Sequence, residues 1–170
     1  NHEAAQGVRS RARDLGFDAC GFACALAPID PEDRLGVWLR AGYNADMAWI
    51  GRTARLRQHP SDYLAGCRTV VVVARNYYAE RPAAGPGTGR VSRYAWGRDY
   101  HRVFQKPLRR LAAFIRGLVP GTETRTSVDT GPVLERAWAA RAGVGWIGKN
   151  CMLIHPEYGS WVFLGAVLTT

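Results

Sequence analysis

The residues with the clearest chemical potential lie between positions 127 and 151. Asp129 lies at the start of a turn. Pro132 fixes its own φ angle near the value required at the first position of a following helix. A carboxylate and bare backbone beside aromatic residues can hold a large flat cofactor, but the spacing also fits a plain strand–turn–helix unit in which Asp129 caps the helix. Three later glycines permit positive φ angles or close approach to a ligand: Gly143, Gly145 and Gly148.

The chemistry that these residues allow is proton donation by Asp129. We expect its carboxyl group to lie in an aromatic setting that includes Trp138, Trp146 and Trp96. If that setting excludes water, burial disfavours the carboxylate and raises its pKa. A carboxylic acid that stays protonated near neutral pH can act as a proton donor. Residue types alone do not define the reaction further.

Several common catalytic motifs do not occur. The glycine-rich stretch 142–148 follows a helix rather than a strand, so it does not fit a dinucleotide-binding fingerprint. Gly148-Lys149 is not followed by Ser or Thr, which excludes a Walker motif. His101, beside Asp99 near a helix start, is expected to cap the helix or to pack in the core. The histidines lack metal-ligand spacing: His2, His59, His101 and His155.

Length and composition indicate one domain over residues 1–170. Apolar residues make up 47% of the chain and charged residues 22%, which excludes a disordered protein. The longest apolar runs, 70–74 and 161–168, have the length of strands, so no membrane span is expected. The chain begins without Met or an apolar signal core and stops after a strand-like run. We therefore expect a fragment of a longer protein.

Cysteine usage and net charge bear on location and partners. The four cysteines form no Cys-x-x-Cys pair, so reduced and mostly buried thiols in a cytoplasmic protein are expected. The net charge of +9 favours a polyanionic partner such as nucleic acid, although an arginine-preferring genome would give the same excess. The basic side chains Arg102, Lys106, Arg109 and Arg116 would line one side of a helix, as a solvated face or as a rail for phosphate groups.

Helices and strands alternate along the chain. Hydrophobic spacing predicts helices over 3–15, 30–41, 46–57 and 99–118, and one that begins at 132. Strands are predicted over 17–23, 69–74, 124–128, 152–155 and 161–168, with a surface loop over 80–89. The turn at 157–160 predicts that the last two strands pair as a hairpin. The fold class is therefore α+β, with a mixed, partly antiparallel sheet flanked by helices.

Five motifs follow one another in a fixed order. They are Gly42-Tyr43 with Met47-Ala48-Trp49, Asn76-Tyr77-Tyr78, Arg-Tyr-Ala-Trp-Gly-Arg-Asp-Tyr-His at 93–101, the segment 127–151, and Glu-Tyr-Gly-Ser at 157–160. Together they resemble the N-terminal catalytic domain of epoxyqueuosine reductases, cobalamin-dependent enzymes of queuosine synthesis in tRNA. The resemblance spans nearly the whole chain and implies an α+β domain of the cobalamin-processing, nitroreductase-like type.

The resemblance also implies site residues. Asp129 would match the proton donor above the cobalt, and Arg57, in Arg-Gln-His-Pro, would contact cobalamin. Ser92 occupies the place where some relatives carry a cysteine close to the metal. None of these residues is expected to ligate the cobalt. Four further residues would line the cofactor, although the two leucines would be core residues in any fold: Lys149, Asn150, Leu153 and Leu164.

The implied reaction is a two-electron reduction of epoxyqueuosine to queuosine, with loss of the epoxide oxygen as water. The partners would be the anticodon stem-loop of queuosine-family tRNAs and an external electron donor, and the protein would be a cytoplasmic monomer. Relatives continue into a ferredoxin-like module with two [4Fe–4S] clusters, which this chain lacks. A flavin-dependent reductase, a non-catalytic cobalamin carrier and an RNA-binding module are the alternatives.

Overall fold

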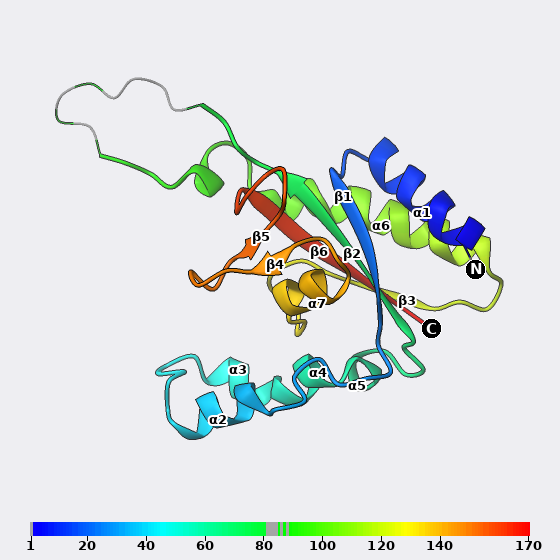
Figure 1. Cartoon of the computed structure of the whole chain (residues 1–170), viewed down its shortest axis with the longest axis horizontal. Helices are drawn as coiled ribbons and strands as arrows, with labels where there is room; N and C mark the ends of the chain where they lie inside the picture. Colours follow the sequence, from blue (N-terminus) through cyan, green and yellow to red (C-terminus); the bar gives the residue numbers. More distant parts are fainter. Residues whose placement is uncertain (1, 81–84, 86, 88) are drawn as a thin grey trace.

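The computed structural model describes residues 2–80, 85, 87 and 89–170. Its N-terminal half contains α1 (His2–Asp14), β1 (Ala19–Cys24), α2 (Arg34–Arg40), α3 (Ala48–Arg52), α4 (Ala54–Gln58), α5 (Pro60–Tyr63) and β2 (Thr69–Asn76). The second half contains the 3₁₀ turn η1 (Arg93–Ala95), α6 (Tyr100–Leu118), β3 (Thr124–Ser127), α7 (Glu135–Arg141), β4 (Trp146–Ile147), β5 (Leu153–Ile154) and β6 (Val162–Thr169). Figure 1 shows these elements arranged around one central sheet.

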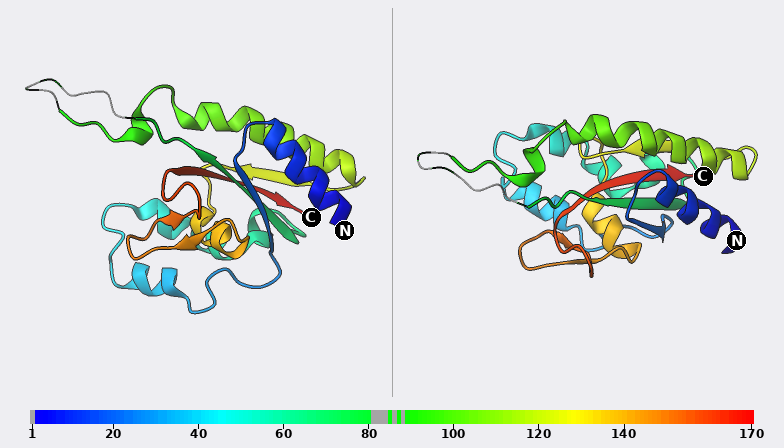
Figure 2. Two further views of the ribbon diagram at one scale, coloured as in Figure 1. Left: turned by 45° about the horizontal axis from the view of Figure 1, so that its top comes forward. Right: turned by 90° about the horizontal axis from the view of Figure 1, so that it is seen from above.

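The central sheet has four strands in the order β1-β2-β6-β3, and each neighbouring pair is antiparallel. Successive side chains of a strand point to opposite faces. Val71 and Val73 of β2 accordingly pack in one core cluster with α1 and α6, whereas Val70 and Val72 pack in the other with α7. Helices therefore cover both faces, as Figure 2 shows, which explains why β2 is a continuous run of apolar residues.

Helix α6 is the longest described helix and follows the sequence pattern closely. Its apolar stripe, with Phe104, Leu108 and Leu111, is buried against the sheet. Asp99 caps the helix, because its carboxylate accepts a hydrogen bond from the His101 backbone N–H at 3.0 Å. The expected α+β class is confirmed, and the described sheet is more completely antiparallel than predicted.

The pairing of the last two strands differs from the prediction. Strand β5 pairs with β4 in a separate two-stranded sheet, and β6 pairs with β2 and β3 in the central one. Residues 157–160 do form a tight turn, closed by a bridge between His155 and Gly159. The hairpin prediction is wrong because a turn sequence specifies a local reversal and not which strand is the neighbour.

Three helix boundaries also differ from the prediction. Helix α2 begins only at Arg34, and Asp30 caps it by accepting the backbone N–H groups of Arg34 and Leu35. The predicted helix over 46–57 is divided at Thr53 into α3 and α4. Helix α7 begins at Glu135 rather than at Pro132, so the residues between form an irregular segment. Most of the predicted loop over 80–89 lies outside the described residues.

The thiols and the helices give two further results. All four cysteines are free, but Cys24 and Cys151 are exposed, so the expectation of mostly buried thiols is wrong. Among the described residues, no helix has both the length and the apolar character that crossing a membrane requires.

Candidate active site

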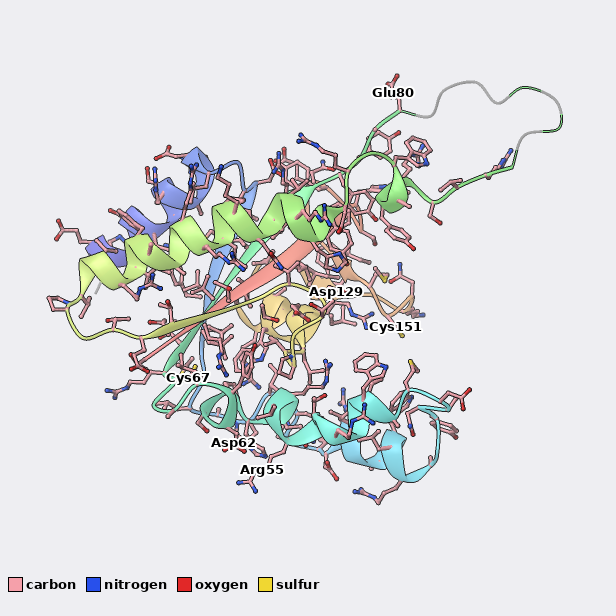
Figure 3. All side chains as sticks on the ribbon, turned by 180° about the vertical axis from the view of Figure 1, so that it is seen from behind. Arg55, Asp62, Cys67, Glu80, Asp129 and Cys151 are labelled. Atoms are coloured by element: carbon pink, nitrogen blue, oxygen red, sulfur yellow. The ribbon has the colours of Figure 1, made fainter. Side chains whose placement is uncertain are left out.

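Asp129 lies in the short turn that joins β3 to the segment before α7 (Figure 3). Its backbone adopts the left-handed region at φ 52°. The Thr130 N–H donates to the Val128 carbonyl at 2.5 Å and closes the turn tightly. A non-glycine residue in this region costs about 1–2 kcal/mol, so the surrounding structure must hold it there. The turn thus presents the Asp129 carboxylate outward in a defined backbone conformation.

A second carboxylate and an imidazole lie next to Asp129. Nε2 of His101 is 3.1 Å from Oδ2 of Asp129, and Nδ1 of the same ring is 2.8 Å from Oδ1 of Asp99. Burial lowers the pKa of His101, but the hydrogen bonds to the two carboxylates outweigh it, so the pKa lies above its ordinary value. The result is a carboxylate–imidazole–carboxylate unit, in which a protonated ring donates to both neighbours.

Tyr100 supports this unit from the sheet side. Its ring stacks on Phe163 of β6 at a centroid distance of 4.2 Å and on His101 at 4.0 Å. Burial, and secondly the hydrogen bond to Asp129, raise the pKa of the Tyr100 hydroxyl. The first turn of α6 and strand β6 thereby fix the position of the imidazole that contacts Asp129.

The predicted aromatic, water-poor setting of Asp129 is not found. The Asp129 side chain is 62% exposed. Trp138 is 1% exposed and belongs to the core under α7, whereas Trp146 is 52% exposed on β4. Trp96 donates from Nε1 to the Val91 carbonyl. These three rings make their contacts elsewhere in the fold. The exposed fraction of the Asp129 side chain shows that its carboxylate is accessible to solvent.

Glu135 is a site residue that the sequence analysis missed. Its carboxylate accepts a hydrogen bond from Ser127 Oγ at 3.0 Å. Burial raises the pKa of Glu135 to about 7, against the lowering effects of its own backbone N–H, Ser127 and Arg57. An acidic residue at the first position of a helix is ordinarily explained by the helix dipole, so the sequence gives no separate signal for it.

The pH dependence of stability is a direct test of the Glu135 environment. Its pKa of about 7 in the folded chain exceeds the ordinary value of 4.5, so between these pH values the folded state binds more protons than the unfolded state. The free energy of unfolding should therefore fall as the pH rises through this window, by on the order of 3 kcal/mol. We expect Glu135→Gln to remove this contribution in urea unfolding measured at several pH values. The raised pKa of His101 also makes stability depend on pH, but it does so equally in both proteins. Identical pH slopes in the two proteins would therefore contradict the environment described for Glu135.

The other predicted site residues occupy different environments. Arg57 is buried, donates from Nε to Thr53 Oγ1 at 3.0 Å and lies over the Trp49 ring. Its charge lowers the pKa of Glu135, so the structure brings Arg57 into the electrostatic surroundings of the Asp129 turn. Ser92 is exposed directly before η1.

The remaining predicted residues belong to the β4–β5 hairpin and β6. Lys149 and Asn150 are exposed in the connection of the hairpin, where Asn150 Oδ1 accepts the Met152 N–H. Leu153 is 2% exposed in the core, and Leu164 is half-buried against the same cluster. Of the three glycines, Gly143 has a positive φ of 72°, and a Cβ on Gly145 would collide with the Ile154 carbonyl. The close approach at Gly145 is thus made by the chain itself.

Fold and site together define an α+β domain that displays an acid–base unit beside an antiparallel sheet. Within this class, the chain resembles epoxyqueuosine reductases. The family model described as "Epoxyqueuosine reductase QueG, DUF1730" matches residues 57–130. Epoxyqueuosine reductase from Gloeobacter violaceus is 52% identical over 165 residues, which are 96% of this chain and 51% of that protein. The protein of the same name from Synechocystis sp. is 50% identical over 85% of this chain and 52% of its own length.

Solved structures give the same result. A selenomethionine-labelled epoxyqueuosine reductase superimposes with a TM-score of 0.86 at 31% identity, over 99% of this chain and 46% of its own. Another, solved with an epoxyqueuosine-modified tRNA-Tyr stem loop, gives a TM-score of 0.85 at 31% identity, over 99% of this chain and 45% of its own. A reductive dehalogenase described with a mechanism for B12-dependent dehalogenation shares the fold, with a TM-score of 0.54, 20% identity and coverage of 96% and 19%. The resemblance inferred from the motifs is confirmed, and the chain spans about half the length of the curated relatives it matches.

Proposed function

We propose that this chain is the cobalamin-binding catalytic domain, residues 1–170, of an epoxyqueuosine reductase. The observation that carries the proposal is the Asp99–His101–Asp129 unit within a chain that overlaps an epoxyqueuosine reductase structure over 99% of its length. The reaction adds two electrons and two protons to epoxyqueuosine in tRNA, which gives queuosine and one water. The solved relative with an epoxyqueuosine-modified tRNA stem loop supports this choice of substrate.

The exposed apolar side chains fit a large flat cofactor. Met47 and Trp49, at the start of α3, are 40% and 48% exposed, and Trp146, Ile147 and Met152 of the β4–β5 region are 41–52% exposed. Figures 1 and 2 show these two segments at the same end of the molecule. Large apolar side chains that are left half exposed together mark a surface for a ligand or a partner. A corrin ring has the size and the apolar faces to cover such a set.

The residues of the site divide between proton transfer and cofactor binding. Bound cobalamin would supply the electrons for the reduction. Asp129 would pass a proton to the epoxide oxygen as the carbon–oxygen bond breaks, and the protonated His101 ring, 3.1 Å from Asp129 Oδ2, would orient the Asp129 carboxylate and supply that proton to it. The exposure of Asp129 in this chain leaves it accessible, so that cofactor and substrate cover it when they bind.

The cofactor-binding residues that we propose are those that the family resemblance implies. Arg57, Lys149 and Asn150 would offer polar side chains to cobalamin, and Ser92 would lie where some relatives carry a cysteine close to the cobalt. Leu153, whose side chain is buried, contributes its backbone, and Leu164 contributes its half-exposed apolar surface. An external donor would supply the electrons, and the [4Fe–4S] clusters that the resemblance implies would lie outside these residues. We place the reaction in the cytoplasm and expect a monomer.

The test of the function is the conversion of epoxyqueuosine in a tRNA stem-loop. The chain, reconstituted with cobalamin and a strong chemical reductant, is incubated with the modified stem-loop, and the nucleosides are analysed by mass spectrometry. We expect a product lighter by one oxygen atom that depends on cobalamin. Cobalamin binding without conversion, also in the presence of an iron–sulfur module from a relative, would favour the carrier alternative. Dependence on flavin in place of cobalamin would favour the flavin reductase.

The basic face of α6 is the proposed contact for tRNA phosphates. Arg102, Lys106, Arg109 and Arg110 are exposed and line one shallow depression along the helix. Each phosphate contact releases counterions, so we expect the triple replacement of Arg102, Lys106 and Arg109 by Gln to weaken stem-loop binding and to reduce the salt slope by about one unit per lost contact. The control removes three exposed charges elsewhere: Arg13, Arg34 and Arg68. Equal losses of stem-loop affinity in both triple variants would indicate general charge attraction rather than a specific phosphate-binding face on α6.

A further inference from the structure

Glu135 and Ser127 connect the two elements on either side of the Asp129 turn. Ser127 is the last residue of β3 and is 4% exposed, and Glu135 is the first residue of α7. The hydrogen bond from Ser127 Oγ to Glu135 Oε1 is 3.0 Å long. It therefore joins the start and the end of the irregular segment that contains Asp129.

The turn itself packs on this hydrogen bond. A Cβ atom on Gly131 would collide with Ser127 Oγ, so the hydroxyl group lies directly against the Gly131 backbone. Asp129 keeps a left-handed conformation two residues earlier. Such a conformation persists only where the surroundings determine it. The Ser127–Glu135 contact is the described side-chain hydrogen bond that fixes both ends of the segment.

Five groups face the Glu135 carboxyl group, one of them Tyr100 of α6, whose hydroxyl pKa is raised in part by the charge of Glu135. Asp129 of the turn opposes its ionisation, and Arg57 of α4, Ser127 of β3 and its own backbone N–H favour it. Burial is the largest influence and raises the pKa of Glu135 to about 7. The carboxyl group therefore exchanges between its neutral and charged forms near neutral pH, and its charge faces Asp129.

We propose that Glu135 is a positioning residue for Asp129, which holds the 128–131 turn through Ser127 and changes the arrangement of the turn when it gains or loses its proton. The proposal rests on the proposed function, since Glu135 would position the residue that transfers the proton in that reaction. Two facing carboxylates repel each other, whereas a neutral Glu135 does not repel Asp129. The conformation that presents Asp129 should therefore differ between the two protonation states of Glu135.

A nuclear magnetic resonance titration of the chain tests this coupling without cofactor or substrate. The side-chain carboxyl carbon of Glu135 and the amide signals of Asp129, Thr130 and Gly131 are followed from about pH 5 to 9. We expect all of them to share a midpoint at about pH 7. The His101 ring also faces Asp129, so its signals are followed separately. Only the component of the amide titration that disappears in Glu135→Gln is assigned to Glu135.

The variants decide between outcomes. Amide signals of the turn that titrate identically in the unmodified chain and in Glu135→Gln would overturn the proposal. If Glu135→Gln does not give the spectrum of a folded protein, Ser127→Ala decides instead, because loss of its hydrogen bond must move the midpoint. Glu123→Gln, at an exposed position, is the matched control and should change nothing in the turn.

Activity provides the second readout. In the reconstituted system, Glu135→Gln should lower kcat by about 10–100-fold with KM nearly unchanged, and it should remove the limb of the pH–rate profile near pH 7. An unchanged kcat and pH profile would overturn the proposal and leave the proposed function intact. If the unmodified protein itself does not reduce epoxyqueuosine, the proposed function fails, while the titration result still decides whether Glu135 positions the turn.

Discussion

Asp129→Asn is expected to lower the rate of epoxyqueuosine reduction by about 10²–10⁴-fold while cobalamin binds as before. Asn has nearly the same shape and is tolerated in the left-handed region, so the turn at φ 52° should persist. Its amide oxygen can still accept a hydrogen bond from His101, which lies 3.1 Å from the present carboxylate. The substitution thus removes the acidic group, and with it one of the two carboxylates that raise the pKa of His101, while the turn stays in place. Single-turnover rates with the modified stem-loop, together with cofactor titrations, measure the two effects separately.

The control for this prediction is Asp14→Asn, an exposed carboxylate at the end of α1. It should leave both the rate and the cofactor affinity unchanged. If Asp129→Asn keeps a rate within about twofold of the unmodified protein, Asp129 is not the proton donor, since general acids contribute far more than that. Loss of cofactor binding in Asp129→Asn would assign a binding role to this residue in place of proton transfer.

Trp138→Ala is expected to destabilise the fold by about 3–5 kcal/mol, because it removes a large buried ring and leaves a cavity. Trp138 is 1% exposed and packs between α7 and the sheet, next to Ala139, Val133 and Leu153. Globular domains are stable by only about 5–15 kcal/mol, so the loss is a large part of the total. Chemical denaturation at one pH measures it through the midpoint of the transition.

Trp146→Ala is the matched control for Trp138→Ala, since the residue types are the same and the burial is opposite. Trp146 is 52% exposed, so its removal should change the free energy of unfolding by less than about 0.5 kcal/mol. Under the proposed function it should nevertheless weaken cobalamin binding, because its ring belongs to the exposed apolar set. Similar destabilisation in both variants would contradict the packing described for α7.

The sequence was sufficient for the elements whose signal is local. The apolar stripe of α6 and the β-branched run of β2 each predict one kind of structure, and both are found. Strand neighbours are a different matter, because β6 lies between β2 and β3 through contacts between distant residues. No local pattern distinguishes that arrangement from a hairpin of β5 with β6.

The same distinction applies to the site. Asp129 is recognisable because it lies beside turn residues and within a specific motif. Its contact with His101 joins residues that are 28 positions apart, and it depends on how α6 lies across the sheet. Glu135 resembles an ordinary acidic residue at a helix start, and only its burial against Ser127 distinguishes it. Chemistry that arises from tertiary contacts was therefore beyond the reach of sequence patterns.

The most direct test of the central claim is a titration of cobalamin with the purified chain, followed by visible absorption. We predict a saturable spectral change at equimolar protein that Asp129→Asn retains and Trp146→Ala shifts to higher protein concentration. A cobalamin spectrum that stays identical to that of the free cofactor at every protein concentration, or a bound yellow flavin in its place, would contradict the account.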